Sequence, residues 1–328
     1  MSNSRTQPPA AWPTIRPGNL YLVQPNYSTG SGQFQSHWLP YSVGCLWAYA
    51  RQFDDIAARY TLRGLVYERL PIDQAVDRMA DPAVVGFSNY VWNFNYNRAL
   101  AEAVKRRWPN AFIVFGGPEV PDDPGPLFAS APWLDATVHK EGELAFVALL
   151  RALAQPGASP TGIAGVCWRA GAGITATPSG GRIADLSALP SPYLTGVFDE
   201  LLRDRPGTAW AATLETTRGC PYKCRFCDWG SAVFTKVNRF PLERVDGELG
   251  WLAANRVEYV FMADANFGIF AERDAQIADC ILAAVERTGY PRTFNIQWAK
   301  NSNLGVARLA RKLAAVQKGL TLSVQSMS

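Results

Sequence analysis

Short apolar runs alternate with amphipathic stretches along most of the chain, which predicts strands that alternate with helices. Before residue 155 the expected strands are 19–25, 83–88, 111–117 and 136–139, and the expected helices are 41–53, 97–108 and 143–153. Strands linked in this way by helices are typical of a parallel sheet with both faces covered. Residues 19–154 are therefore expected to form an open, Rossmann-like α/β domain.

The composition changes on both sides of this domain. Residues 1–18 are polar and carry four prolines, which predicts a flexible tail. Residues 155–204 are rich in Gly, Pro, Ser and Ala, and turn signals around residues 165–177 favour a hairpin. This second segment is interpreted as a linker that contains a hairpin.

Beyond the linker the alternation of strands and helices begins again. The expected strands are 211–217, 257–263, 293–298 and 320–325, and the expected helices are 242–255, 272–288 and 304–316. Four strands do not close a βα barrel, and the last would be an uncovered edge. Residues 205–328 are thus expected to form the N-terminal part of a barrel that is truncated at its C-terminus.

The composition excludes several classes of protein. Hydrophobic residues make up 48% and charged residues 18% of the 328 residues, the balance of a globular protein. The net charge is only +4, with basic and acidic residues interspersed, so nothing favours a nucleic-acid partner. No apolar run reaches the roughly 18 residues of a membrane span, and the N-terminus has no signal architecture. A cytoplasmic protein with no membrane partner is expected.

Three of the six cysteines fall within eight residues, spaced C-x3-C-x2-C in the stretch ETTRGCPYKCRFCDWG. This stretch follows the first strand of the second domain, and reactive groups of βα folds collect on such loops. Three thiolates suit three irons of a cubane and leave the fourth iron open. A structural zinc site wants four protein ligands, and the two histidines, His37 and His139, are expected in the other domain. Zinc held by three cysteines and water, and a redox pair at Cys224 and Cys227, stay open as alternatives.

The isolated cysteines Cys45, Cys167 and Cys280 stand in apolar helix-like or strand-like stretches. Free cysteine in such a setting behaves as a small buried hydrophobic residue. A packing role is expected for all three.

The motif of Cys220, Cys224 and Cys227, with the aromatic Phe226 before its third cysteine, resembles that of the radical S-adenosylmethionine (SAM) enzymes. The resemblance implies a four-iron, four-sulfur (4Fe–4S) cluster that cleaves SAM reductively to a 5′-deoxyadenosyl radical. It also implies an electron donor such as flavodoxin or ferredoxin.

Polar residues at the ends of the later strands are, by this resemblance, candidates to contact the cofactor. Asp264 and Asn266 follow the second strand, and capping of the next turn is their alternative role. The family's Gly-Gly-Glu element is not recognisable there. The third and fourth strands bring the remaining candidates, Gln297, Lys300, Ser323, Gln325 and Ser326.

The order of the two domains is similar to that of the cobalamin-dependent branch of the family. The stretches VVGFSNYVWN, FGGPEVPDDP and HKEGELAF also match it. The resemblance implies a cobalamin at the carboxyl ends of the first domain's strands, near Ser88, Asn89, Gly116 and Gly117. Neither histidine has the Asp-x-His-x-x-Gly context of a cobalt ligand, so no protein histidine is expected on cobalt.

This branch implies a methyltransferase that acts on an unactivated carbon, or on phosphorus, of a small metabolite or peptide. A cyclase or rearrangement enzyme without methyl transfer is one alternative. An inactive fragment that only binds a metal cluster is the other.

Overall fold

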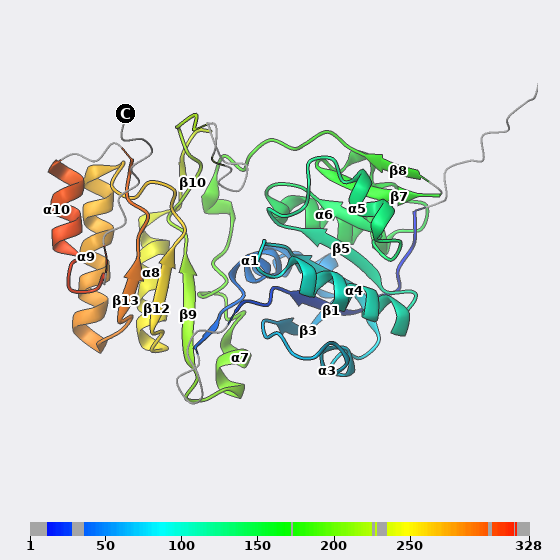
Figure 1. The fold of residues 1–328 in the computed structure, drawn as a ribbon, viewed down its shortest axis with the longest axis horizontal. Helices are drawn as coiled ribbons and strands as arrows, with labels where there is room; N and C mark the ends of the chain where they lie inside the picture. The colour runs from blue at the N-terminus through cyan, green and yellow to red at the C-terminus, as the bar shows by residue number, and fades with distance from the viewer. Residues whose placement is uncertain are drawn as a thin grey trace, which may run out of the picture. The chain divides into compact units, whose positions relative to one another are not determined.

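The computed structural model describes residues 12–27, 36–171, 173–224, 227, 235–300, 304–317 and 319. The chain divides into two compact units (Figure 1). The first unit comprises Met1–Pro25 and Tyr49–Arg182, and the second comprises Asn26–Ala48 and Ile183–Ser328.

The first unit is built on a seven-stranded sheet in the order β3-β1-β4-β5-β6-β7-β8. Its strands are β1 (Gly18–Val23), β3 (Tyr60–Val66), β4 (Pro82–Ser88), β5 (Phe112–Gly116), β6 (Ala136–Val138), β7 (Val166–Ala170) and β8 (Gly173–Ala176). The pairings from β3 to β6 are parallel, whereas β7 and β8 are added antiparallel. The sheet is therefore mixed, with a parallel centre.

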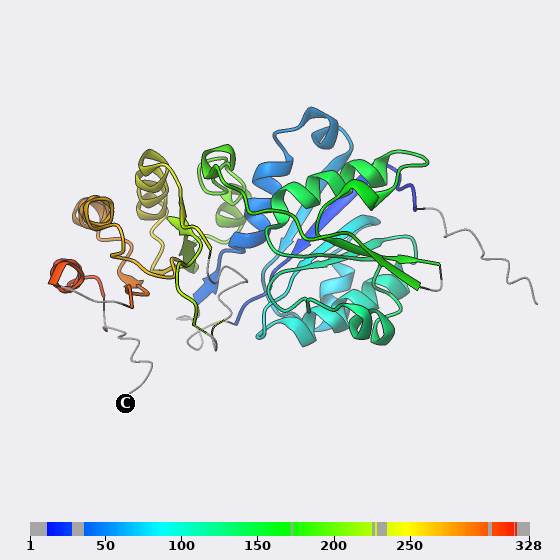
Figure 2. The ribbon, with the colours of Figure 1, turned by 90° about the horizontal axis from the view of Figure 1, so that it is seen from above.

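Helices cover both faces of this sheet (Figure 2). They are α2 (Asp54–Ala57), α3 (Ile72–Asp77), α4 (Phe94–Arg107), α5 (Gly125–Ser130) and α6 (Gly142–Ala154), whereas residues 41–48 of α1 (Tyr41–Ala50) belong to the second unit. Alternate residues of β4 and β5 point to opposite faces. Val85 and Phe115 belong to the core that includes Leu100 of α4, whereas a side chain at Gly86 would face Phe146 of α6.

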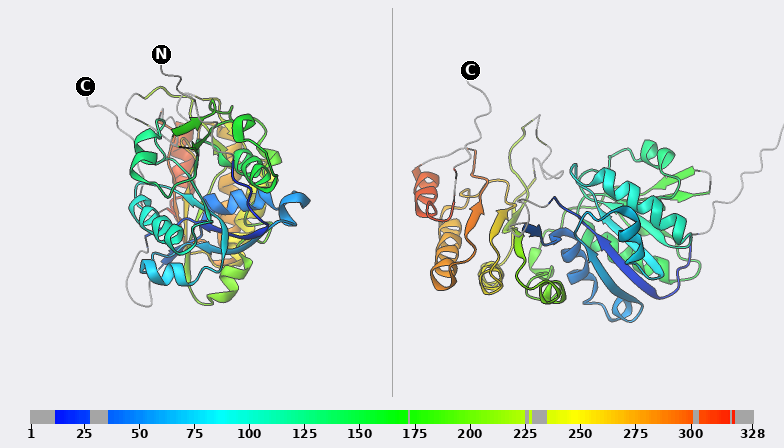
Figure 3. Two further views of the ribbon diagram at one scale, coloured as in Figure 1. Left: turned by 90° about the vertical axis from the view of Figure 1, so that its right-hand side faces the viewer. Right: turned by 60° about the horizontal axis from the view of Figure 1, so that its bottom comes forward.

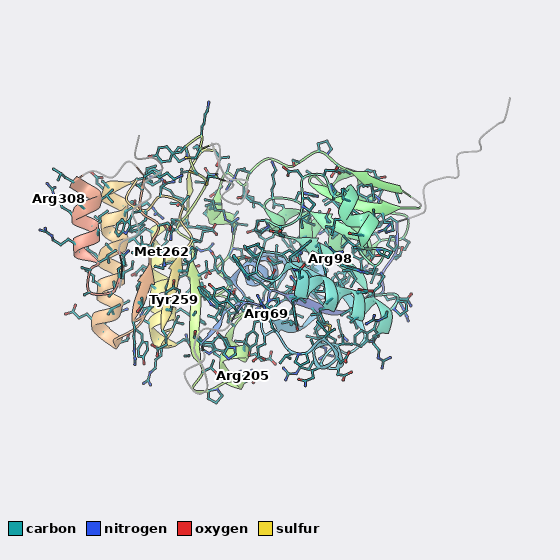
Figure 4. All side chains as sticks on the ribbon, viewed as in Figure 1. Arg69, Arg98, Arg205, Tyr259, Met262 and Arg308 are labelled. Carbon is teal, nitrogen blue, oxygen red and sulfur yellow. The ribbon has the colours of Figure 1, made fainter. Side chains whose placement is uncertain are left out.

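The second unit has a four-stranded parallel sheet in the order β13-β12-β9-β2. Its strands are β2 (Ser36–Trp38), β9 (Ala209–Leu214), β12 (Tyr259–Met262) and β13 (Thr293–Asn295), and a separate short ribbon joins β10 (Thr217–Arg218) to β11 (Asn238–Arg239). Figure 4 marks the course of β12 from Tyr259 to Met262.

The helices of the second unit are α7 (Asp199–Asp204), α8 (Leu242–Ala254), α9 (Ala271–Thr288) and α10 (Leu304–Lys312). Both α8 and α9 lie on the same side of the strands (Figure 3, right). Glu272 and Asp274 in the first turn of α9 and Arg287 in its last turn have the charges that the helix dipole favours at each end. This is the layer arrangement of an open βα half-barrel.

The expected division of the chain needs three corrections. The hairpin assigned to the linker 155–204 is β7 and β8, and β7 pairs with β6 of the first sheet, so the first domain extends past residue 154. Residues 26–48, expected within the first domain, belong to the second unit, where β2 pairs with β9. His37 lies on β2 and is therefore in the same unit as the cysteine motif, contrary to expectation.

Four elements of the first unit were not expected, namely the edge strand β3 and the short helices α2, α3 and α5. The expected strand 320–325 lies outside the described residues. The expected fold class, an open α/β domain followed by a partial βα barrel, agrees with the observed sheets.

Candidate functional site

The three motif cysteines lie on the segment that follows β9, at the carboxyl edge of the parallel sheet. Cys220 is buried, with 3% of its surface exposed, whereas Cys224 and Cys227 are half-buried. The Cys227 N–H donates to the Cys224 carbonyl at 3.1 Å, so these two residues share a turn. This turn leaves the thiols of Cys224 and Cys227 partly exposed to a ligand, whereas Cys220 is buried and anchors the segment in the protein.

The ends of the cysteine loop are tied together. The Thr235 N–H donates to the Cys220 carbonyl at 2.8 Å, next to the β10–β11 ribbon. Gly219 makes this closure possible because its φ is +115° and a Cβ there would lie 2.3 Å from the Lys236 carbonyl oxygen. The loop therefore leaves and returns at one point of the sheet edge.

Two side chains from neighbouring strand ends donate hydrogen bonds to the cysteine sulfurs. Asn266, after β12, donates from Nδ2 to Cys220 Sγ at 3.2 Å. Lys300, after β13, donates from Nζ to Cys224 Sγ at 3.1 Å. The hydrogen bond with Cys224 raises the pKa of Lys300, and the charges of Cys224, Cys227 and Cys220 act in the same direction. All three thiols thus lie within electrostatic reach of one ammonium group.

Asp264 fastens the start of the loop. Its carboxylate is 1% exposed and accepts hydrogen bonds from the Thr216 N–H at 3.1 Å and from both the N–H and the hydroxyl of Thr217. Burial raises the pKa of Asp264 to about 7, although the hydrogen bonds from Thr217 and Thr216 oppose the shift. These contacts direct its side chain to the backbone that leads into Cys220, and its expected position near the cofactor stays a prediction.

Arg273 supports the same segment and was missed by sequence reasoning. Its guanidinium donates to the Thr216 carbonyl at 3.2 Å and to the Phe240 carbonyl at 2.8 Å. Its neighbour Asp274 accepts from the N–H of Gly268 at 2.7 Å and shapes the turn after Asn266. Neither residue could be found from a local motif. The Arg273 contacts join positions that are distant in sequence, and the Asp274 contact lies within an irregular loop.

The other predicted cofactor residues are not brought to the cysteines by any contact in the described residues. The Gln297 amide donates to Asn295 Oδ1 at 2.9 Å, and the Gln297 carbonyl accepts from the Phe267 N–H. Phe226, Ser323, Gln325 and Ser326 lie outside the described residues. The cofactor contacts of these residues stay predictions.

The side chains around the three thiols suit an iron–sulfur cluster better than a single metal ion. Among the described residues, no three His, Cys, Asp or Glu side chains converge as ligands of one metal ion. A cubane binds each thiolate through a different iron, so its three cysteines need not converge on one metal ion. Asn266 Oδ1 is buried without a hydrogen-bond partner, a polar atom beside Cys220 that a bound group could satisfy. The three thiols and the two side chains that donate to their sulfurs fit an iron–sulfur cluster. The oxygen of Asn266 fits a polar ligand bound beside that cluster.

In the first unit, the carboxyl ends of β4 and β5 carry a buried amide network. The Asn89 side chain is fully buried and donates to the carbonyls of Phe87 and Gly116 at 3.3 and 3.1 Å. Asn97 of α4 donates to Asn89 Oδ1 at 3.0 Å and to the Ser88 carbonyl at 3.2 Å. The Asn89 side chain therefore links the carboxyl ends of β4 and β5 from a buried position. Ser88, the preceding residue, is 6% exposed.

Gly117 lies directly against this network. Its φ is +95°, and a Cβ there would lie 2.5 Å from the Asn89 carbonyl oxygen, whereas a Cβ at Gly116 would have ordinary contacts only. The requirement for glycine at residue 117 comes from the protein's own backbone.

We expect Gly117→Ala to lower the free energy of unfolding by about 2–4 kcal/mol, because it adds left-handed strain to an overpacked contact. Chemical denaturation would measure the loss. Gly162→Ala is the matched control, since a Cβ at Gly162 meets nothing within 4 Å. Equal stabilities of the two variants would refute this account of the strand end.

The two histidines differ in their surroundings. His139 Nε2 lies 3.0 Å from the Thr137 hydroxyl, and burial lowers the pKa of His139. The His37 ring packs against Trp210 with 6.1 Å between ring centroids.

Comparison with known proteins adds family information to this geometry. The B12 binding domain family matches residues 57–150, inside the first unit. The chain is 41% identical over 293 residues to the cobalamin-dependent radical SAM methyltransferase TokK of Streptomyces tokunonensis, covering 88% of this chain and 43% of TokK. The chain resembles the cobalamin-dependent radical SAM enzymes along most of its length.

A second curated protein is also similar. The chain is 39% identical over 293 residues to 2-(S-pantetheinyl)-carbapenam-3-carboxylate methyltransferase of Streptantibioticus cattleyicolor, covering 88% of this chain and 43% of that protein. The chain thus spans less than half the length of these two curated relatives.

Solved structures show the same fold at low sequence identity. The cobalamin-dependent SAM radical enzyme OxsB, with aqua-cobalamin and SAM bound, aligns with a TM-score of 0.65 and 17% identity over 92% of this chain and 43% of OxsB. The radical SAM methyltransferase TsrM of Kitasatospora setae aligns with a TM-score of 0.64 and 16% identity over 91% of this chain and 58% of TsrM. The predicted fold class and the predicted resemblance to cobalamin-dependent radical SAM enzymes are confirmed. No helix within the described ranges has the length and apolarity to cross a membrane.

Proposed function

We propose that this chain supplies the cobalamin-binding domain and the first part of the radical SAM barrel of a cobalamin-dependent methyltransferase. The observation that carries the proposal is the motif of Cys220, Cys224 and Cys227, with N–H donors aimed at two of its sulfurs, in a chain 41% identical to TokK. Its cofactors are a 4Fe–4S cluster, SAM and cobalamin.

The residues of the second unit have separate tasks in this function. Cys220, Cys224 and Cys227 hold the cluster, and Asp264 and Arg273 hold the backbone that presents Cys220. When bound, the cluster supplies the electron that cleaves SAM reductively, from a donor such as flavodoxin or ferredoxin. The buried position of Cys220 keeps water from one side of the site.

The residues of the first unit prepare a face for cobalamin. Asn89 and Gly117 set the ends of β4 and β5, and a flat cofactor binds across the carboxyl ends of strands in open sheets. When bound, cobalamin carries the methyl group. Ser88 and Gly116 border this edge and are the residues of this unit that we propose contact the cofactor.

The acceptor of the methyl group is an unactivated carbon, or phosphorus, of a small metabolite or peptide. Similarity to the carbapenam carboxylate enzyme makes 2-(S-pantetheinyl)-carbapenam-3-carboxylate the first compound to assay. We expect the anaerobically reconstituted protein, incubated with cobalamin, reductant, SAM and acceptor, to form S-adenosylhomocysteine, 5′-deoxyadenosine and a methylated product.

A cyclase or rearrangement enzyme without methyl transfer is the second candidate. It is supported by 26% identity over 217 residues to the anaerobic magnesium-protoporphyrin IX monomethyl ester cyclase of Rubrivivax gelatinosus, which covers 63% of this chain and 38% of that protein. The same assay separates the candidates. Formation of 5′-deoxyadenosine with no S-adenosylhomocysteine would refute methyl transfer and support the cyclase type.

A further inference from the structure

We infer that Asn266 and Lys300 raise the reduction potential of the cluster by donating hydrogen bonds to the sulfurs of Cys220 and Cys224. This inference rests on the proposed iron–sulfur function of the three cysteines. It assigns to each side chain a role in tuning electron transfer, apart from any contact with SAM.

The geometry pairs one donor with each of two ligands. Asn266 Nδ2 lies 3.2 Å from Cys220 Sγ, and Lys300 Nζ lies 3.1 Å from Cys224 Sγ, both within the range of hydrogen bonds to sulfur. The donors follow β12 and β13, adjacent parallel strands that end at the same edge as β9. The strand order therefore brings both donors to the cysteine loop.

The two donors differ in charge and in burial. Asn266 is neutral and 5% exposed, and its side-chain oxygen Oδ1 is buried without a hydrogen-bond partner, so its amide donates to Cys220 in an environment of low dielectric. Lys300 is half-buried and carries a positive charge. Each therefore acts on the sulfurs in its own way, one through a dipole and one through a full charge.

The direction of the effect follows from charge. One-electron reduction adds a negative charge to the cluster and its thiolates, which N–H donors and a nearby cation stabilise. Hydrogen bonds to the sulfurs are among the factors that set the potentials of iron–sulfur clusters. A low-potential one-electron donor is the reductant, and its electron enters the cluster more readily while both contacts are present.

The test is a redox titration of the reconstituted full chain, followed by the electron paramagnetic resonance (EPR) signal of the reduced cluster. The variants are Asn266→Leu, which keeps the side-chain size and removes the amide, and Lys300→Met, which removes the ammonium group. At the wild-type midpoint potential, we expect the ratio of reduced to oxidised cluster to fall about 2- to 10-fold in each, the range for one net hydrogen bond. Lys300→Arg should restore most of the wild-type ratio.

Matched controls apply the same changes elsewhere. Asn255→Leu alters an amide that donates to the Trp251 carbonyl, and Lys312→Met alters an ammonium group paired with Asp279. Neither should shift the midpoint. If Asn266→Leu fails to fold, Asn266→Ser replaces it, because the serine hydroxyl is too short to reach the sulfur. The two Lys300 variants, Lys300→Met and Lys300→Arg, test the effect of the charge independently of Asn266.

The outcomes distinguish the inference from the function on which it rests. If the wild-type chain binds no iron and sulfide, the proposed function fails. If the variants bind the cluster with unshifted midpoints, or if Lys300→Arg behaves as Lys300→Met, the tuning role is wrong while the cluster stands.

Discussion

Replacement of any one of Cys220, Cys224 and Cys227 by alanine is expected to abolish both cluster binding and the reductive cleavage of SAM. In the proposed site each thiolate would hold its own iron, and we expect a cubane left with two protein ligands to be lost during reconstitution. We expect the wild-type protein to carry about four irons and four acid-labile sulfides per chain, as a 4Fe–4S cluster requires. Each variant should carry less than a quarter of that amount, with no 5′-deoxyadenosine formed above background.

The control for this prediction is Cys280→Ala, because Cys280 lies on α9, outside the motif. Its iron content, and its visible absorbance from sulfur-to-iron charge transfer, should match those of the wild type. Retention of zinc by the triad, with iron never bound, would favour the zinc alternative.

Asp264→Ala is expected to produce the largest loss of stability in the second unit. It removes the acceptor of the Thr216 and Thr217 N–H groups, both of which are buried. Each unpaired buried donor costs about 1–3 kcal/mol, so a loss of about 2–6 kcal/mol is expected near pH 5, where the wild-type carboxyl is protonated and buries no charge. Denaturant unfolding of the full chain under anaerobic conditions measures it, and Asp279→Asn on the exposed side of α9 should have no such effect.

The stability contributed by Asp264 should also depend on pH. Folding raises the pKa of this carboxyl from 3.8 to about 7, mainly through burial, so the folded state binds the proton more tightly than the unfolded state. This contribution is fully present below about pH 4 and is lost as the pH rises to about 7, an effect of at most about 4 kcal/mol.

Asp264→Asn removes this titration and keeps an oxygen that can accept the Thr216 and Thr217 N–H groups. The variant should match the wild type near pH 5 or fall slightly below it, and it should gain stability relative to the wild type as the pH rises to 8. Thermal unfolding at both pH values tests this. A difference between the two proteins that does not change with pH would contradict the raised pKa.

Much of the fold could be predicted from the sequence because its strands have strong local signals. The apolar runs at β4, β5 and β12 are bounded by turn residues, and the amphipathic pattern of α9 spans five turns. Their bounds differ from the expected ones by only a few residues. Local pattern is sufficient where an element buries one or both faces along its whole length.

The elements that were misplaced depend on long-range pairing. β2 has three residues and no periodicity of its own, and it becomes a strand because it pairs with β9, more than 170 residues later. The hairpin of β7 and β8 looked like part of a linker, since β8 is exposed throughout. β3 carries Arg63 and Gly64 in its middle, which an edge strand tolerates and a central strand does not.

The candidate site was predictable in kind but not in its internal contacts. The spacing of the cysteines is a local property, and so is the position of Asp264, Asn266 and Lys300 after apolar strands. Which of them touches a sulfur is decided by tertiary structure. Asp264 turns to the backbone of Thr216 and Thr217, 48 and 47 residues earlier, whereas Asn266 reaches Cys220.

The measurement that tests the central claim most directly is the EPR spectrum of the reduced, reconstituted protein with and without SAM. A cluster held by Cys220, Cys224 and Cys227 has one iron without a protein ligand, so SAM should bind there and change the spectrum. We predict a clear shift of the signal on addition of SAM, saturable with concentration. A 4Fe–4S signal that SAM leaves unchanged would contradict the account.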